Sequence, residues 1–179
     1  GEAIGTEGNV FKNVRDLYNN NFDKSEVFRG LDFGFTTDPS AYVEWCYSIR
    51  NRSIYCLNEF VAKGADNETL ASNIAVYNKH NFRVWCDSSE PRTINELIKL
   101  GIRAVGVRKG QDSVRHGIKW LQSLNGIYIN PITCPHTYKE FTEYEYKTDR
   151  FGEYTGELLD KNNHTIDATR YALNTKIEY

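Results

Sequence analysis

The apolar residues of this chain change their spacing part-way along the sequence. Three β-rich runs come first, at residues 27–33, 41–47 and 53–60. A short polar turn at residues 48–52 separates the last two runs, which predicts an antiparallel meander. From residue 67 onward, helical and strand-like segments alternate, as expected of parallel strands joined by helices. The pattern predicts an α/β fold with a mixed central sheet, an antiparallel meander plus parallel strands, and helices on both faces.

The later segments have recognisable boundaries. Leu70, Ile74 and Tyr77 are spaced as one helix face, which predicts a helix over residues 67–79 with Asp66 as its N-cap. We expect a helix and a hairpin within residues 138–160. The other helices are expected at residues 91–101, 113–124 and 164–177, and the other strands at 82–86, 102–107 and 127–129.

The first 26 residues differ in character from the remainder. They are rich in glycine and asparagine, so we interpret residues 1–26 as a linker with a short helical turn at 14–18. The folded domain is expected to span residues 27–179. The chain contains no methionine, even at position 1, so we expect it to be a fragment of a larger protein.

Composition excludes several classes of protein. Lysine and arginine number 22 against 24 acidic residues, so the net charge of −2 excludes a strongly basic nucleic-acid coat protein but not a local basic face. No apolar run approaches the roughly 18 residues of a membrane helix, and no signal-peptide pattern is present, so we expect neither a membrane protein nor a secreted one. The four cysteines form no C-x-x-C pair, which favours buried free thiols over a zinc site.

Two aspartates lie near or just after the ends of strand-like runs. Asp32 lies inside the first apolar run, near its end, where burying an acid is costly unless something compensates its charge. Asp87 comes directly after residues 82–86. Each could simply cap the turn that follows it. The carboxyl ends of neighbouring parallel strands, however, are where ligand groups gather in α/β sheets. Two acids placed there would repel each other unless a cation lay between them.

A third aspartate, Asp167, begins the last expected helix and shares one face of it with His164 and Tyr171. Asp167 alone is explained by the helix dipole, which favours an acid in the first turn. Together, the three acids form a set of hard oxygen ligands suited to Mg²⁺ or Mn²⁺. Two such ions about 4 Å apart can activate a water molecule and stabilise the leaving oxygen of a phosphodiester. His164 could relay a proton or contact the scissile phosphate.

These residues lie in segments that resemble a known family. Residues 31–41 (LDFGFTTDPSA), 87–91 (DSSEP) and 163–172 (NHTIDATRYA) resemble three motifs of the large terminase subunits of tailed bacteriophages, whose nuclease domain is RNase H-like. Residues 109–114 (KGQDSV) are also similar to that family. Residues 5–11 (GTEGNVF) resemble the segment that joins its ATPase motor to its nuclease.

The resemblance implies a nuclease domain excised from such a protein, with residues 1–26 as the linker from its ATPase domain. No phosphate-binding G-x-x-x-x-G-K-[ST] loop is present, so this chain is not the motor. The resemblance implies Asp32, Asp87 and Asp167 as ligands of two divalent cations, Mg²⁺ or Mn²⁺, with His164 close by. A fourth ligand could come from Asp38, Glu59 or Asp160.

The resemblance also implies a biological setting. The expected reaction is two-metal-ion endonuclease cleavage of double-stranded, concatemeric viral DNA during genome packaging. The expected partners are that DNA, the ATPase domain of the same chain, the procapsid portal and the small terminase subunit. The expected location is the cytoplasm of the infected bacterial host, transiently at the portal.

Charge is distributed unevenly in the later half. Residues 108–119 contain four cations, Arg108, Lys109, Arg115 and Lys119, and one anion, so we expect them to border the DNA path. A solvated helix face is the simpler explanation. Residues 138–160 contain three cations and seven anions, and we interpret this acidic segment as a candidate gate beside the site.

Two other functions remain open on the sequence. Another RNase H-like enzyme, such as a hybrid nuclease or a junction resolvase, would share the three acids and differ in substrate. A non-cutting module that docks DNA or the portal would need neither the acids nor a metal.

Overall fold

The computed structural model of the chain describes residues 8–108 and 110–177. The strands are β1 (Val14–Asp16), β2 (Val27–Asp32), β3 (Pro39–Ser48), β4 (Ser53–Lys63), β5 (Val84–Asp87), β6 (Ala104–Val107), β7 (Gly126–Ile129), β8 (Tyr146–Thr148) and β9 (Tyr154–Leu158). The helices are α1 (Asn67–Tyr77), α2 (Pro91–Lys99), α3 (Ser113–Ser123), α4 (Pro135–Glu143) and α5 (His164–Ala172).

Seven strands form one mixed sheet in the order β1-β7-β4-β3-β2-β5-β6. The β2–β3–β4 pairings are antiparallel, which confirms the predicted meander. The remaining pairings, β2–β5, β5–β6, β4–β7 and β1–β7, are all parallel. The fold class predicted from the change in apolar spacing is therefore confirmed.

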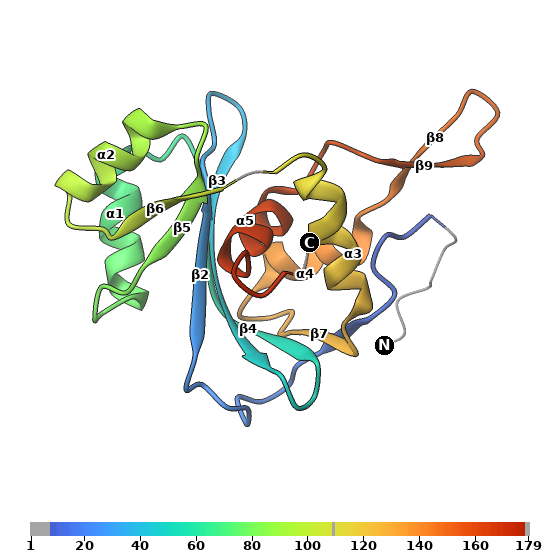
Figure 1. Ribbon diagram of the computed structural model, residues 1–179, viewed down its shortest axis with the longest axis horizontal. Helices are drawn as coiled ribbons and strands as arrows, with labels where there is room; N and C mark the ends of the chain where they lie inside the picture. The colour runs from blue at the N-terminus through green and yellow to red at the C-terminus, as the bar shows by residue number, and fades with distance from the viewer. Residues whose placement is uncertain (1–7, 109, 178–179) are drawn as a thin grey trace.

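Helices cover both faces of this sheet (Figure 1). On one face, α1 and α2 pack through Leu70, Ile74 and Leu97 into a core that includes Leu31 of β2. On the other face, α3, α4 and α5 share a larger core centred on the fully buried Trp45 of β3. The strand ends therefore lie between two hydrophobic layers, which fixes their positions.

The predicted helical turn at residues 14–18 is wrong. Residues 14–16 form the edge strand β1, with Val14 opposite Ile127 of β7. Neighbouring contacts hold this segment extended, because the Asn13 amide donates to the carbonyls of Leu121 and Leu124, each at 2.9 Å. A three-residue segment gains more from these long-range bonds than from one isolated turn of helix.

Residues before 27 also contribute to the core. Val10 and Phe11 are each 3% exposed and belong to the larger core. The compact part of the chain thus reaches back beyond residue 27, although residues 1–7 of the predicted linker lie outside the described residues. That residues 1–26 follow an ATPase domain stays a prediction.

Other sequence predictions hold with modest changes. Asp66 caps α1 by accepting from the Thr69 N–H at 2.8 Å. Residues 138–160 contain most of α4 and the β8–β9 hairpin, which projects from the body in Figure 1. Helix α5 ends at Ala172 rather than at residue 177. Just beyond this end, the Asn174 side chain donates a hydrogen bond to the Tyr171 carbonyl. All four cysteines are buried free thiols, as predicted. Among the described helices, none is long and apolar enough to cross a membrane.

Candidate active site

Asp32 and Asp87 lie at the carboxyl ends of two adjacent parallel strands. Asp32 is the last residue of β2, and Asp87 is the last residue of β5. Leu31 pairs with Cys86 across these strands, so each aspartate directly follows a paired position. Both acids therefore lie at one edge of the sheet.

Helix α5 brings His164 and Asp167 to the same edge. His164 Nδ1 is 3.3 Å from Oδ2 of Asp32, and its Nε2 is 3.8 Å from Oδ1 of the exposed Asp38. The charges of Asp167 and Asp87 both raise the pKa of Asp32, so each of these two acids lies within electrostatic reach of Asp32. The four site residues singled out in the sequence therefore converge.

Two further side chains of α5 contact these carboxylates. Arg170 donates from Nη2 to Oδ1 of Asp167 at 2.9 Å, and the Tyr171 hydroxyl donates to Oδ2 of Asp87 at 3.4 Å. Gly117 of α3 leaves room for the arginine, because a Cβ atom there would lie 2.8 Å from the Arg170 Cδ. Neither Arg170 nor Tyr171 was assigned a role from the sequence. For Arg170 a signal was present, because it lies three residues after Asp167 on the same helix.

A carboxylate from another helix holds the start of α5. Glu140 of α4 accepts from the Thr165 N–H at 2.7 Å and from the Thr165 hydroxyl at 2.6 Å. An acid at a helix N-terminus satisfies N–H groups that have no partner within the helix and interacts favourably with its dipole. Glu140 therefore positions the turn that presents His164.

The environment of the acids disfavours negative charge. Burial raises the pKa of Asp32 to about 6, although the hydrogen bond from His164 opposes the rise. Burial also raises the pKa of Asp167, against the opposing charge of Arg170. The hydrogen bond with Asp32 raises the pKa of His164. Carboxyl groups whose pKa is raised in this way have too little positive charge nearby to stabilise their ionised form.

The donor chemistry fits Mg²⁺ or Mn²⁺. Asp32, Asp87 and Asp167 offer hard carboxylate oxygens. Within residues 8–108 and 110–177, no three His, Cys, Asp or Glu side chains are arranged to hold a metal ion as they stand. His164 and Arg170 engage oxygens of two of the acids instead. These contacts involve Oδ2 of Asp32 and Oδ1 of Asp167, so the other oxygen of each carboxylate could bind a cation while the contacts are kept.

The three candidates for a fourth ligand occupy different places. Glu59 accepts from the backbone N–H groups of His136 and Thr137 at the start of α4, so its carboxylate serves that helix. Asp38 lies beside His164. The charge of Asp160 raises the pKa of Asp167, which places it within reach of the acids. Of the three candidate ligands, Glu59 is thus engaged at the start of α4, whereas Asp38 and Asp160 lie near His164 and Asp167.

The predicted basic window spans a strand end and a helix. Arg108 directly follows β6, whose last residue pairs with Asp87 of β5, while Arg115 and Lys119 lie on α3. Arg115 and Lys119 line a hollow shared with Glu157 of β9, and Asp32, Asp87 and Asp167 are not among the residues that line it. Lys109 lies outside the described residues.

A mixed sheet with acids at two strand ends and on a late helix defines the RNase H-like class of nuclease folds. A family model described as the terminase RNAseH like domain matches residues 32–175, and the chain belongs to this family. It is 39% identical over 181 residues to the large terminase subunit of Bacillus phage SPP1, covering 96% of this chain and 42% of that protein. The chain thus spans less than half the length of this relative.

Solved structures agree with this assignment. The crystal structure of the g2p (large terminase) nuclease domain from bacteriophage SPP1, with bound Mn, has a TM-score of 0.82 at 39% identity and covers 93% of this chain and 98% of that one. The large terminase nuclease from thermophilic phage G20c, with bound magnesium, has a TM-score of 0.64 and covers 95% and 98%. At 12% sequence identity, this similarity is evidence only that the two proteins share a fold.

Proposed function

We propose that this domain is an endonuclease that cuts double-stranded, concatemeric viral DNA during genome packaging by two-metal-ion hydrolysis. The observation that carries the proposal is the convergence of Asp32, Asp87 and Asp167 with His164 at one edge of the sheet. The Mn and magnesium bound to the SPP1 and G20c nucleases support divalent cations as the cofactors.

The three aspartates are the proposed metal ligands. Bound divalent ions would supply an activated water and stabilisation of the leaving oxygen. Asp32 also orients the His164 ring through Nδ1, which leaves Nε2 directed toward the open side where Asp38 lies. From that position His164 can donate a proton to a leaving oxygen or a hydrogen bond to the scissile phosphate. Arg170 and Tyr171 hold the carboxylates of Asp167 and Asp87.

Contacts to DNA should go to phosphates, because a packaging nuclease cuts with little regard to sequence. We propose that the residues bordering the DNA path include Arg108, Lys109, Arg115 and Lys119. The remaining partners are proposed from the family: the ATPase domain of the same chain, the procapsid portal and the small terminase subunit. The reaction would then take place in the cytoplasm of the infected host, at the portal.

Plasmid digestion tests this proposal. The native chain, Asp167→Ala and the control Glu68→Ala, at an exposed position of α1, are incubated with supercoiled plasmid in Mg²⁺, Mn²⁺ or EDTA. We expect linear fragments in either metal from the native chain and the control, and none in EDTA or from Asp167→Ala. No cutting by the native chain would favour a docking module. Faster cutting of an RNA–DNA hybrid or a four-way junction than of duplex DNA would favour another RNase H-like enzyme.

A further inference from the structure

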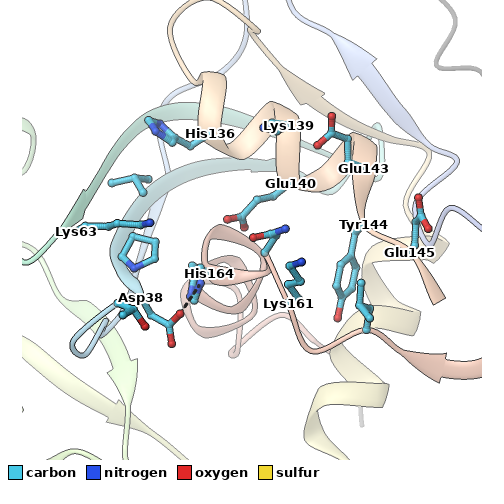
Figure 2. A pocket seen from close by; sticks show the side chains of 15 residues that line it. Asp38, Lys63, His136, Lys139, Glu140, Glu143, Tyr144, Glu145, Lys161 and His164 are labelled. Atoms are coloured by element: carbon cyan, nitrogen blue, oxygen red, sulfur yellow. Dashed lines mark ion pairs between the residues drawn. The ribbon is translucent and has the colours of Figure 1, made fainter. Parts of the chain in front are cut away.

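A groove of about 780 Å³ opens beside the candidate centre. His164 and Asp38 form part of its lining, so the groove meets the place where the acids converge. Its other walls come from the end of β4, one face of α4 and the loop that precedes α5 (Figure 2). Neither Arg108 nor Arg115 nor Lys119 lines it, so it is separate from the basic window predicted from the sequence.

Three lysines from three different segments face this groove. Lys63 ends β4 opposite Pro39, which places it next to Asp38. Lys139 lies on the groove-lining face of α4, and Lys161 precedes α5 by three residues. All three side chains are exposed, and none forms an ion pair with the part of the chain that the structure describes.

Four acidic side chains also line the groove: Asp38, Glu140, Glu143 and Glu145. The carboxylate of Glu140 binds the first turn of α5. Figure 2 shows Glu143 and Glu145 toward the opposite end of the groove from Lys63. Asp38 is the acidic residue at the Lys63 end of the groove, where its Oδ1 lies 3.8 Å from Nε2 of His164.

We propose that this groove holds the phosphate backbone of double-stranded DNA next to the cleavage site, with Lys63, Lys139 and Lys161 as phosphate contacts. The assignment rests on the proposed function, because it gives that nuclease a substrate-binding surface. Unpaired ammonium groups spread along a groove suit the repeated charges of a nucleic-acid backbone, whereas a single small anion would need donors that converge on one point. Lysines without a fixed hydrogen-bonding geometry contact phosphates with no preference for sequence.

Binding measurements with charge-matched variants test the assignment. In one variant Lys63, Lys139 and Lys161 are all changed to glutamine, which keeps most of each side chain and removes three charges. In the matched variant three exposed lysines that do not line the groove are changed instead: Lys12→Gln, Lys79→Gln and Lys99→Gln. Thermal unfolding of all three proteins establishes that they fold alike.

The readout is the affinity for a short DNA duplex in EDTA, measured by fluorescence anisotropy over a range of salt concentrations. Each lost phosphate contact lowers the slope of log K against log salt by about 0.9, so the groove variant should lose about 2 to 3 from the slope and bind at least tenfold more weakly at low salt. The matched variant should keep the native slope. A groove variant that binds like the matched variant, or a native chain that does not bind the duplex, overturns the assignment.

Cleavage in Mn²⁺ separates this assignment from the proposed function. If the native chain cuts plasmid while both triple variants bind and cut alike, the groove assignment fails and the nuclease stands. If the native chain binds duplex DNA through the three lysines but never cuts it, the groove assignment is supported and the proposed nuclease function is wrong.

Discussion

Gly30 of β2 lies against the backbone of Ala168 in α5. A Cβ atom on Gly30 would be 1.9 Å from the Ala168 carbonyl oxygen and 2.7 Å from the backbone nitrogen of Ala172. The strand and the helix therefore meet with no side chain between them at this point. This contact sets how closely Asp32, two residues along β2, approaches Asp167, the residue before Ala168. The convergence of the acids thus depends on a glycine.

Replacing Gly30 should separate the strand from the helix. We expect Gly30→Ala to lower the free energy of unfolding by about 3 kcal/mol, because backbone atoms cannot move aside as a side chain can. Urea denaturation measures the change. Gly156→Ala in β9 is the control, since a Cβ atom there meets nothing within 4 Å. Equal stability of the two variants would show that α5 can shift away from β2 at little cost.

The convergence of the acids was predictable because it follows from local pattern and simple topology. Asp32 and Asp87 end apolar runs, and parallel strands place their carboxyl ends at one edge of a sheet. Asp167 and His164 lie on one face of an amphipathic helix. The motifs around these residues resembled a family whose model matches residues 32–175.

The remaining features depend on contacts between segments that are distant in the sequence. The strand β1 exists because β7 pairs with it, and residues 14–16 alone do not encode that partner. Glu140 caps α5 and Glu59 caps α4, each from a different element, so the usual search for a capping residue next to the helix misses both. The groove lysines are likewise brought together by the fold and form no cluster in the sequence.

The capping role of Glu140 has a consequence for stability against pH. Burial raises the pKa of Glu140 above its ordinary value. The folded state therefore binds a proton at this position more tightly than the unfolded state does. The stability that this proton provides is present below the unfolded pKa and is lost as pH rises through the folded one.

Glu140→Gln removes that titration and retains a carbonyl oxygen to accept from Thr165. We expect the variant to gain stability relative to the native chain as pH rises from 4 to 7, measured by urea denaturation in EDTA. Glu96→Gln, at an exposed position of α2, should show a constant difference from the native chain. A constant difference for Glu140→Gln as well would contradict the raised pKa.

His164 should affect cleavage far more than metal binding, because it contacts Asp32 and faces the groove without belonging to the proposed ligand set. We expect His164→Asn to slow plasmid cleavage about 100-fold, the typical contribution of a proton-transferring group. Its affinity for Mn²⁺, measured by calorimetry, should stay within a few-fold of the native value. His80→Asn, at an exposed position before β5, serves as the control. Loss of Mn²⁺ binding in His164→Asn would make His164 a metal ligand instead.

Arg170 supplies positive charge to Asp167, so its removal should make the fold depend on a cation. The guanidinium is almost fully buried and lies 2.9 Å from the Asp167 carboxylate. We expect Arg170→Gln to lower the free energy of unfolding in EDTA by about 3 kcal/mol, because it leaves a largely buried carboxylate without its cationic partner.

Mn²⁺ should then restore part of that loss, since an ion held by the carboxylates provides the missing charge and stabilises only the folded state. The expected result is a larger Mn²⁺-induced rise in melting temperature for Arg170→Gln than for the native chain. Arg83→Gln, whose side chain lies over Trp85, should show the native rise. A rise in Arg170→Gln no larger than the native one would mean that the cation and the guanidinium do not interact with the same carboxylate, which would argue against Asp167 as a metal ligand.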